Sequence, residues 1–355
     1  NDTEFKTLTN YKEINFNNLF FGIVLQLSKS FDNFIKKYYK AKKIIEKTRP
    51  KCLIFRTMTP YESSNFIFRK ICKDIKLPYV TWIHGGIHSY SLGGYDVTDF
   101  RFCRNHISYG IHLDEIINDE KSVLNELNLQ KNHKIYPVGS LRFDYFTKKR
   151  KSKKFLKKNN KFTILFTIGW GFMRNSYSLG TNSKKLFFFN SAWEFQYQII
   201  KLLQKYQHKY NIIVKDYPIP PNGNLWKSIL RDLNAKNITY VSNQFSFTDL
   251  LNISDLNILP WTSTTFFGSQ YYEADIFCIN EDIDINLFKD KFKNELFYFD
   301  NTTEYLKELD KYLEQGNFYK RKKENSRDYF INFKNLHKRD KLLSQALSQI
   351  IQERK

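Results

Sequence analysis

The sequence lacks the features that would assign it to several well-defined classes of protein. Its four cysteines, Cys52, Cys72, Cys103 and Cys278, are widely spaced and form no CxxC pair. This spacing argues against a zinc site or a disulfide framework and favours buried, reduced thiols in a cytosolic protein. No apolar run approaches the ~20 residues that span a bilayer. Zinc-finger spacing, an RNP-like motif and a continuous basic recognition helix are also missing, so we expect no nucleic-acid binding.

The beginning of the sequence carries neither a Met nor a signal peptide, since it opens with Asn1 and a polar stretch. One interpretation is therefore an excised module of a longer protein. We expect a cytoplasmic location, with peripheral contact to the inner membrane as an alternative.

The composition is that of a globular chain with a strong positive charge. With 355 residues, of which 41% are hydrophobic and 17% aromatic, the chain can bury the cores of two domains or one large one. Its 57 Lys and Arg exceed its 36 Asp and Glu, which gives a net charge of +21. Such a field attracts polyanions, anionic membrane surfaces or phosphorylated substrates without choosing among them.

Short apolar runs alternate with helical patterns, and the pattern restarts halfway along the chain. We expect strands in both halves, over residues 52–55, 79–83, 106–109, 134–138, 162–168, 211–215, 238–241, 256–259, 276–279 and 296–299. We expect helices over residues 17–47, 60–74, 122–127, 191–206, 225–233, 247–251 and 302–313, and from about 319 to the end. This alternation predicts an α/β fold with parallel sheets, arranged as two Rossmann-like domains that face a cleft.

A basic segment divides the two halves. Nine of the fifteen residues from 147 to 161 are Lys or Arg. We interpret the segment as a linker between an N-terminal domain (1–146) and a C-terminal domain (162–315), with helices over 316–355 packing back on the first domain. A solvated loop and a contact with anionic lipid are alternatives.

The second half carries three strand-end loops that suit a nucleotide-activated donor, because ligands of parallel sheets bind outside the carboxyl ends of strands. After the run 256–259 come Ser263, Thr264 and Thr265, whose hydroxyls and amides precede a helix expected to carry Glu273. Such a cluster suits a phosphate, and an ordinary helix cap is the alternative. In the other two loops, Gly171 lets the backbone approach a ligand closely, and Arg174 and Lys215 supply positive charges for a phosphate. Tyr217, followed by Pro218, offers a ring on which a base can stack.

The first half carries the candidate catalytic groups. His84 and His88 follow the run 79–83 and are flanked by glycines, so either could act as a general base toward a sugar hydroxyl. A hydrogen-bonded structural His at a tight turn is the alternative for both. Asp96, Asp99 and Asp144 are the candidate carboxylates for a base or a nucleophile. No ligand spacing supports a metal site.

From about residue 51 to 313 the chain resembles the GT-B glycosyltransferases that build bacterial capsules and lipopolysaccharide. In the first half the resemblance lies in the strand followed by His84-Gly85-Gly86, in Tyr109-Gly110, and in the turn Gly139-Ser140-Leu141-Arg142. In the second half it lies in the order Lys-x-x-Pro, helix, Asn-Ile strand, Asp-Leu-Leu, Ser-Asp strand, Ser-Thr-Thr, and helix with Glu.

The resemblance implies a nucleotide-sugar donor, a glycan or glycolipid acceptor, and no metal or other cofactor. Members that use CMP-activated acidic sugars such as Kdo or sialic acid carry a His-Pro pair, where this chain has Tyr217-Pro218. The expected activity is transfer of a sugar from a nucleotide donor to a lipid-linked surface glycan, and the resemblance weakly favours a CMP-Kdo-like donor. Whether the anomeric configuration of the sugar is retained or inverted is left open. The alternatives are a polyol-phosphate transferase of the CDP-glycerol type, a UDP-GlcNAc 2-epimerase-like enzyme, and a basic nucleic-acid or membrane-binding module.

Overall fold

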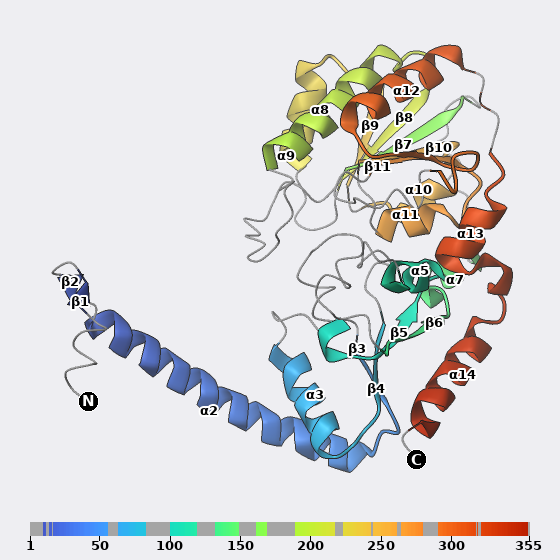
Figure 1. Cartoon of the computed structure of the whole chain (residues 1–355). Coiled ribbons are helices and arrows are strands. Elements are labelled where there is room, and N and C mark those ends of the chain that lie inside the picture. The colour runs from blue at the N-terminus through green and yellow to red at the C-terminus, as the bar shows by residue number, and fades with distance from the viewer. Residues whose placement is uncertain are drawn as a thin grey trace.

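The chain forms two α/β domains, each built around its own parallel sheet (Figure 1). The computed structural model describes residues 10–11, 14–15, 17–55, 63–82, 100–118, 132–148, 161–168, 189–216, 223–242, 244–260, 264–279, 290–316, 318 and 321–353. Every pair of neighbouring strands in the two domain sheets is parallel. The predicted α/β class with two Rossmann-like domains is therefore confirmed.

The first sheet has the strand order β3-β4-β5-β6, which are Leu53–Phe55, Tyr79–Trp82, Asn105–Ser108 and Lys134–Pro137. Helices α2 (Asn17–Thr48) and α3 (Ser63–Asp74) cover one face, where Ile45 and Ile71 belong to the same apolar cluster as Phe55. Helix α5 (His112–Asn118) follows β5, and α7 (Leu141–Lys148) follows β6. A short antiparallel pair, β1 (Asn10–Tyr11) and β2 (Ile14–Asn15), precedes α2.

The second sheet has six strands in the order β12-β11-β10-β7-β8-β9. These strands are β7 (Thr163–Thr167), β8 (Asn211–Lys215), β9 (Ile238–Val241), β10 (Leu256–Leu259), β11 (Asp275–Ile279) and β12 (Phe297–Phe299). Every residue of β7, β8, β10 and β11 is buried. Their nearly continuous apolar sequences are typical of parallel strands covered on both faces.

Helices cover both faces of the second sheet. One face packs against α8 (Phe189–Lys205), α9 (Gly223–Asp232) and α12 (Thr302–Gln315), through residues such as Ile199, Trp226 and Leu309. The other face packs against α10 (Phe247–Leu251) and α11 (Thr264–Ser269). The cluster on that second face also contains Phe143 of α7, so it is the face turned toward the first domain. None of the described helices is both long and apolar enough to cross a lipid bilayer.

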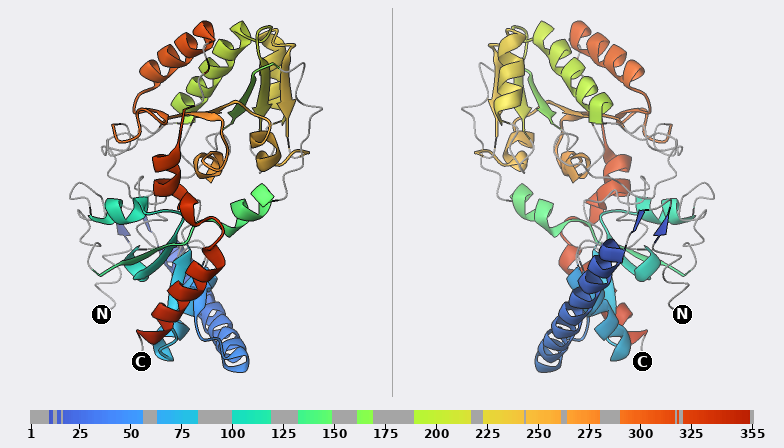
Figure 2. Two further views of the ribbon diagram at one scale, coloured as in Figure 1. Left: turned by 90° about the vertical axis from the view of Figure 1, so that its right-hand side faces the viewer. Right: turned by 90° about the vertical axis from the view of Figure 1, so that its left-hand side faces the viewer.

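The end of the chain crosses from the second domain to the first (Figure 2). Helix α13 (Glu324–Ile331) joins the cluster around α11, and after the 3-10 turn η2 (Phe333–Asn335) helix α14 (Arg339–Gln352) packs Ala346 and Ile350 on the first sheet. The helical pattern predicted from about residue 319 is interrupted at Asn332, which adopts a φ of 50° and ends α13. The break redirects the chain from one domain to the other.

Candidate functional site

The strand order brings together the strand ends that carry the predicted donor loops. Strands β10, β7 and β8 are neighbours, with Ile258 opposite Phe166 and Thr167 opposite Lys215. The chain runs from β7 to one side through β8 and β9, and then places β10 on the other side of β7. Ligands of open parallel sheets bind outside the carboxyl ends at such a switch point. All three loops leave this edge, although residues 169–175, 217–218 and 261–263 lie outside the described part of the chain.

Lys215 and Asp216 are two consecutive buried charged residues at the carboxyl end of β8. The Nζ of Lys215 donates a hydrogen bond to the backbone oxygen of Asp216 at 2.7 Å, and burial lowers the pKa of Lys215. The hydroxyl of Tyr240, on the neighbouring strand β9, donates to Oδ2 of Asp216 at 2.5 Å. Burial and this carboxylate raise the pKa of Tyr240. An ammonium has three N–H donors, so Lys215 can also bind an anion at this edge.

Thr167, at the end of β7, lies beside Lys215 and faces the same side of the sheet. Leu165 and Ile213, two residues earlier on each strand, both belong to the cluster turned toward the first domain. The Oγ1 of Thr167 is buried and has no hydrogen-bond partner among the described residues. Leaving a buried hydroxyl unpaired costs about 1–3 kcal/mol, which an oxygen of a bound ligand would offset. The sequence analysis missed this residue, whose signal is a hydroxyl that ends an apolar strand.

The segment that follows β10 differs from the prediction in one respect. Thr264 and Thr265 are half-buried in the first turn of α11, after Ser263, which lies outside the described residues. The expected extension of this helix to Glu273 is wrong, because α11 ends at Ser269 and the chain then turns into β11. Glu273 is exposed at the amino end of that strand, where its Oε1 lies 2.9 Å from Nη1 of Arg327 on α13. Ligands of parallel sheets sit at the opposite ends of the strands.

The carboxyl edges of the two sheets face each other. Tyr109, which follows β5, contacts Phe267 of α11 with ring centroids 5.6 Å apart. Phe143, in α7 after β6, stacks on Tyr271 at 5.3 Å. Gly268 lies so near that a Cβ atom there would be 2.7 Å from the ring of Phe143. Strand ends of both domains therefore border the interface between them.

Most of the predicted catalytic groups fall on the segment after β4. His84, His88, Asp96 and Asp99 lie outside the described residues, which stop at Trp82 and resume at Phe100. Strand β4 lies between β3 and β5 and ends at Trp82, two residues before His84. Gly171, Arg174, Tyr217 and Pro218 of the donor set are likewise outside the described part. Their roles stay predictions.

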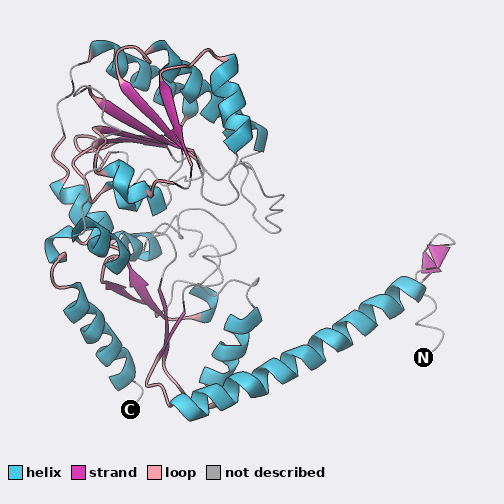
Figure 3. Cartoon of the chain, turned by 180° about the vertical axis from the view of Figure 1, so that it is seen from behind, coloured by secondary structure: helices cyan, strands magenta, loops and turns pink. Residues whose placement is uncertain are grey.

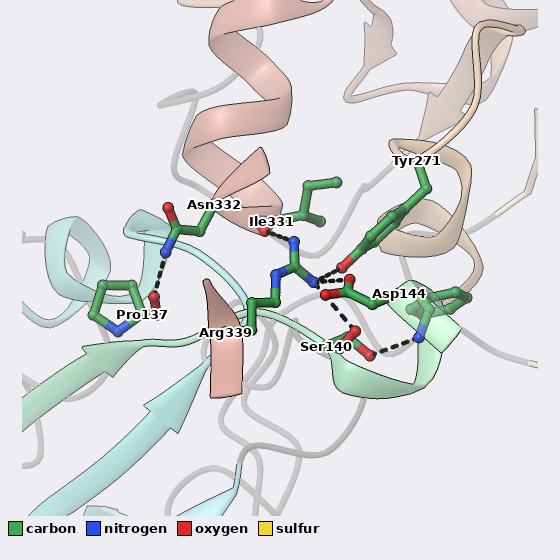
Figure 4. Close-up of polar contacts among 8 residues, drawn as sticks. Pro137, Ser140, Asp144, Tyr271, Ile331, Asn332 and Arg339 are labelled. Carbon is green, nitrogen blue, oxygen red and sulfur yellow. Dashed lines mark hydrogen bonds and ion pairs between the residues drawn. The ribbon is translucent and has the colours of Figure 1, made fainter. Parts of the chain in front are cut away.

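Asp144 is the one predicted catalytic carboxylate that the structure describes, and it is buried at the domain interface (Figure 4). Its Oδ1 pairs with Nη1 of Arg339, which also contacts the hydroxyl of Tyr271 from the second domain. Nη2 of Arg339 donates to the backbone oxygen of Ile331 at 2.7 Å, and Nη1 also donates to that of Ser140 at 3.2 Å. Arg339 thus binds groups from the first domain, the second domain and the crossing segment.

A glycine makes room for this buried arginine. Gly139 has a φ of 96°, in the left-handed region that side chains rarely adopt. A Cβ atom at this position would lie 2.4 Å from Cζ of Arg339. The Gly139-Ser140-Leu141-Arg142 turn, which carried part of the sequence resemblance, therefore packs against Arg339 through Gly139 and accepts its hydrogen bond at Ser140.

A second contact between the domains lies on α5. Lys291 donates to Glu115 at 2.6 Å, and the hydroxyl of Tyr329 donates to the same carboxylate. The Lys291 ammonium also lies 4.1 Å from the centroid of the Tyr329 ring. Burial and Glu115 raise the pKa of Tyr329. Both partners of the ion pair are about 40% exposed, so solvent weakens this contact relative to the Arg339 site.

A chain of hydrogen bonds connects β4 with the surface of the first domain. Oγ1 of Thr81 lies 2.7 Å from Nδ1 of His106, whose Nε2 lies 3.0 Å from Nδ1 of His133. Burial, with a smaller contribution from His133, lowers the pKa of His106 to about 3, so its imidazole is neutral. His133 lines a shallow surface groove with Asp114 and Glu353, away from the interface between the sheets. Within the described ranges, no group of three or more His, Cys, Asp or Glu could hold a metal ion.

The comparisons with known proteins identify the fold. No protein-family model matches the chain, and no curated protein sequence matches it. Among solved structures, the S. aureus MnaA–UDP complex aligns with a TM-score of 0.56 at 12% identity, over 89% of this chain and 82% of that one. The UDP-GlcNAc 2-epimerase of Neisseria meningitidis, bound to UDP-GlcNAc, aligns with a TM-score of 0.55 at 15% identity, over 89% and 81% of the two chains.

A glycosyltransferase is among the similar structures as well. The enzyme from Rickettsia africae aligns with a TM-score of 0.52 at 14% identity, over 90% of this chain and 80% of that one. At these identities the likeness is one of fold, and the fold of the chain is the GT-B-like arrangement of two facing Rossmann-like domains.

Proposed function

We propose that this chain is a glycosyltransferase that binds a nucleotide-activated sugar at the carboxyl edge of the second sheet and passes the sugar to an acceptor held by the first domain. The observation that carries the proposal is the adjacency of β10, β7 and β8 at the switch point, with Thr167 and Lys215 side by side there. A buried cation next to an unpaired buried hydroxyl suits a phosphate group, since both can donate to its oxygens.

Each part of this edge has a role in the proposal. Lys215 offsets the charge of the phosphate, and the hydroxyls of Thr167 and Thr264 donate to its oxygens. The other predicted partners of the phosphate are Gly171, Arg174 and Ser263, together with Thr265 in the first turn of α11, and Tyr217-Pro218 is predicted to lie against the base. His84 remains the proposed general base, with Asp96 and Asp99 as the carboxylates of the same segment.

Asp144 takes a different role from the one that its sequence position indicated. Because its carboxylate neutralises the buried guanidinium of Arg339, we assign it to holding the two domains in register, as a positioning residue. Glu273 lies at the far end of the sheet, where its exposed carboxylate pairs with Arg327 of α13 and is remote from the donor edge. Neither residue enters the proposed transfer chemistry.

The donor and acceptor are the finer parts of the proposal. The proposal of a CMP-activated acidic sugar as donor is supported by the Ser263-Thr264-Thr265 cluster and by Tyr217-Pro218 in the sequence. The MnaA and N. meningitidis structures hold UDP and UDP-GlcNAc, which makes a uridine nucleotide the competing donor. The acceptor is proposed to be a surface glycan on a lipid carrier, which agrees with the net charge of +21.

A second candidate function is a 2-epimerase reaction on UDP-GlcNAc. Structures of such epimerases align over most of the chain, for example the N. meningitidis enzyme over 89% of it. An epimerase converts its nucleotide sugar without an acceptor, whereas a transferase releases nucleotide in proportion to sugar incorporated.

Thermal-shift measurement with CMP, UDP, GDP and CDP tests the proposal and names the donor class. A ligand at a hundred times its Kd adds about 2.7 kcal/mol of stability. At about 2.1 cal/mol/K per residue for 355 residues, this is a rise of roughly 4 °C in Tm. Incubating the activated sugar of the winning base without acceptor then separates the two functions. Epimerised sugar nucleotide favours the epimerase, and no shift with any nucleotide contradicts both.

A further inference from the structure

Much of helix α2 projects beyond the domain to which it belongs. The helix contains 32 residues, which corresponds to about 48 Å at 1.5 Å per residue. Its last turns pack on α3, where Ala41 and Ile45 are buried. The rest of the helix runs past α3 and away from both domains (Figure 3). Every side chain from 28 to 37 is exposed, so this part of α2 is accessible around its whole circumference.

One side of the projecting part is apolar and wide. Phe31, Phe34, Ile35 and Tyr39 are all exposed, Phe31 by 64% and Tyr39 by 60%. At about 100° per residue, these four side chains cover roughly 140° of the helix circumference. A seam that pairs with one other helix is narrower, because it uses only two positions in every heptad. In the sequence the apolar character increases toward the amino end of the helix, where residues 19–27 read LFFGIVLQL.

The charges of the projecting part are almost all positive. Residues 28–43 contain six lysines and a single acidic residue, Asp32. Lys29 and Lys36 lie opposite the apolar side, and Lys37 flanks it. A flanking lysine can direct its ammonium away from the apolar side while its stem covers apolar surface. A second copy of the same helix would bring lysines against lysines, whereas an anionic surface would neutralise them.

We propose that the projecting part of α2 binds an anionic lipid membrane and lies in its head-group region, with the apolar side toward the acyl chains. A wide apolar side, exposed aromatic rings and an opposite side rich in lysine are the features of helices that lie along such an interface. The charges distributed through residues 28–43 hold this part of the helix at the surface of the bilayer and not across it. The inference is independent of the nucleotide-sugar proposal, because lipid binding by α2 involves neither sheet edge.

Co-sedimentation of the full chain with lipid vesicles tests the membrane contact. We expect binding to vesicles that contain phosphatidylglycerol to be more than about tenfold tighter than binding to phosphatidylcholine alone. The Phe31→Ser/Ile35→Ser variant should bind the phosphatidylglycerol vesicles at least about tenfold more weakly, because two apolar side chains no longer enter the lipid. The Lys36→Gln/Lys40→Gln variant should lose about fivefold per lysine. Both variants should keep the melting temperature of the wild type, since all four side chains are exposed.

The matched control is Lys307→Gln/Lys311→Gln on the exposed side of α12, which removes the same charge from the second domain and should bind like the wild type. Three results would overturn the proposal. The first is binding to phosphatidylglycerol vesicles that is no tighter than binding to phosphatidylcholine. The second is an equal loss in the control, which would assign the attraction to the net charge of +21 and not to α2. The third is a chain that binds no vesicles and has twice the mass of 42.7 kDa until Phe31 and Ile35 are replaced, which would assign the apolar side to a second copy.

Discussion

Removing the Asp144 carboxylate should lower the stability of the folded protein and not only its activity. The side chains of Asp144 and Arg339 are 8% and 1% exposed, so Asp144→Ala leaves a buried guanidinium without its counter-charge. Breaking a buried pair in this way costs about 3–5 kcal/mol. With an unfolding entropy of about 2.1 cal/mol/K per residue over 355 residues, we expect Tm to fall by roughly 4–7 °C.

Calorimetry of a double-mutant cycle is the assay. Asp144→Ala, Arg339→Met and the combined variant are compared, and the combined loss should be smaller than the sum by about 0.5–3 kcal/mol because the two residues interact directly. The control is Glu353→Gln, which breaks the exposed ion pair between Glu353, the residue after α14, and Lys134, and should lower the free energy of unfolding by no more than about 1 kcal/mol. An Asp144→Ala variant as stable as the wild type, but inactive, would refute the positioning role and restore the catalytic one.

The remaining predictions concern the same domain and its contacts. Gly139→Ala should unfold at a lower urea concentration than Gly316→Ala. Both glycines have a positive φ, but a Cβ atom at 139 would lie 2.4 Å from the Arg339 guanidinium, whereas one at 316 would lie no nearer than 3.2 Å to any neighbour, the end of the Lys209 side chain. The pKa of His106 is about 3 in the folded state and 6.5 in the unfolded chain, so below pH 6.5 a proton binds the unfolded state in preference. The free energy of unfolding should therefore fall by about 2 kcal/mol between neutral pH and pH 5. Thermal melts at several pH values should show a weaker pH dependence for His106→Gln than for the wild type. Glu115→Gln should lower the free energy of unfolding by about 1 kcal/mol or less, because the ion pair of Glu115 with Lys291 is half exposed. A larger decrease in urea unfolding would indicate that this contact, rather than Arg339, contributes most to holding the domains together.

The sequence predicts the sheets well because parallel strands buried on both faces are written as nearly continuous apolar runs. Residues 163–167, 211–215 and 256–259 show this, and their order as alternating strands and helices predicts that their ends meet at one edge. The ends of helices are harder to predict from the sequence. Helix α11 ends at Ser269, next to Gly268, which packs tightly against Phe143 of the first domain. The sequence pattern continued that helix to Glu273.

Contacts between residues far apart in the sequence were not predictable. Arg339 and Asp144 are 195 residues apart, and a polar turn with an aspartate reads equally well as a catalytic loop. The Thr81–His106–His133 chain combines residues whose local patterns indicate only a strand and a loop. Periodicity reports which side of an element is buried, whereas partners across an interface depend on how the domains dock.

Calorimetric titration of the preferred nucleotide into the wild type and into Lys215→Met tests the central claim most directly. A hydrogen bond from a charged donor is worth about 1.5–3 kcal/mol, so losing it should weaken binding about 10- to 150-fold. Folding should persist, because methionine suits the buried position of this side chain. The matched control is Lys311→Met on the solvent side of α12. Equal affinity of the wild type and Lys215→Met would contradict a phosphate site at the end of β8.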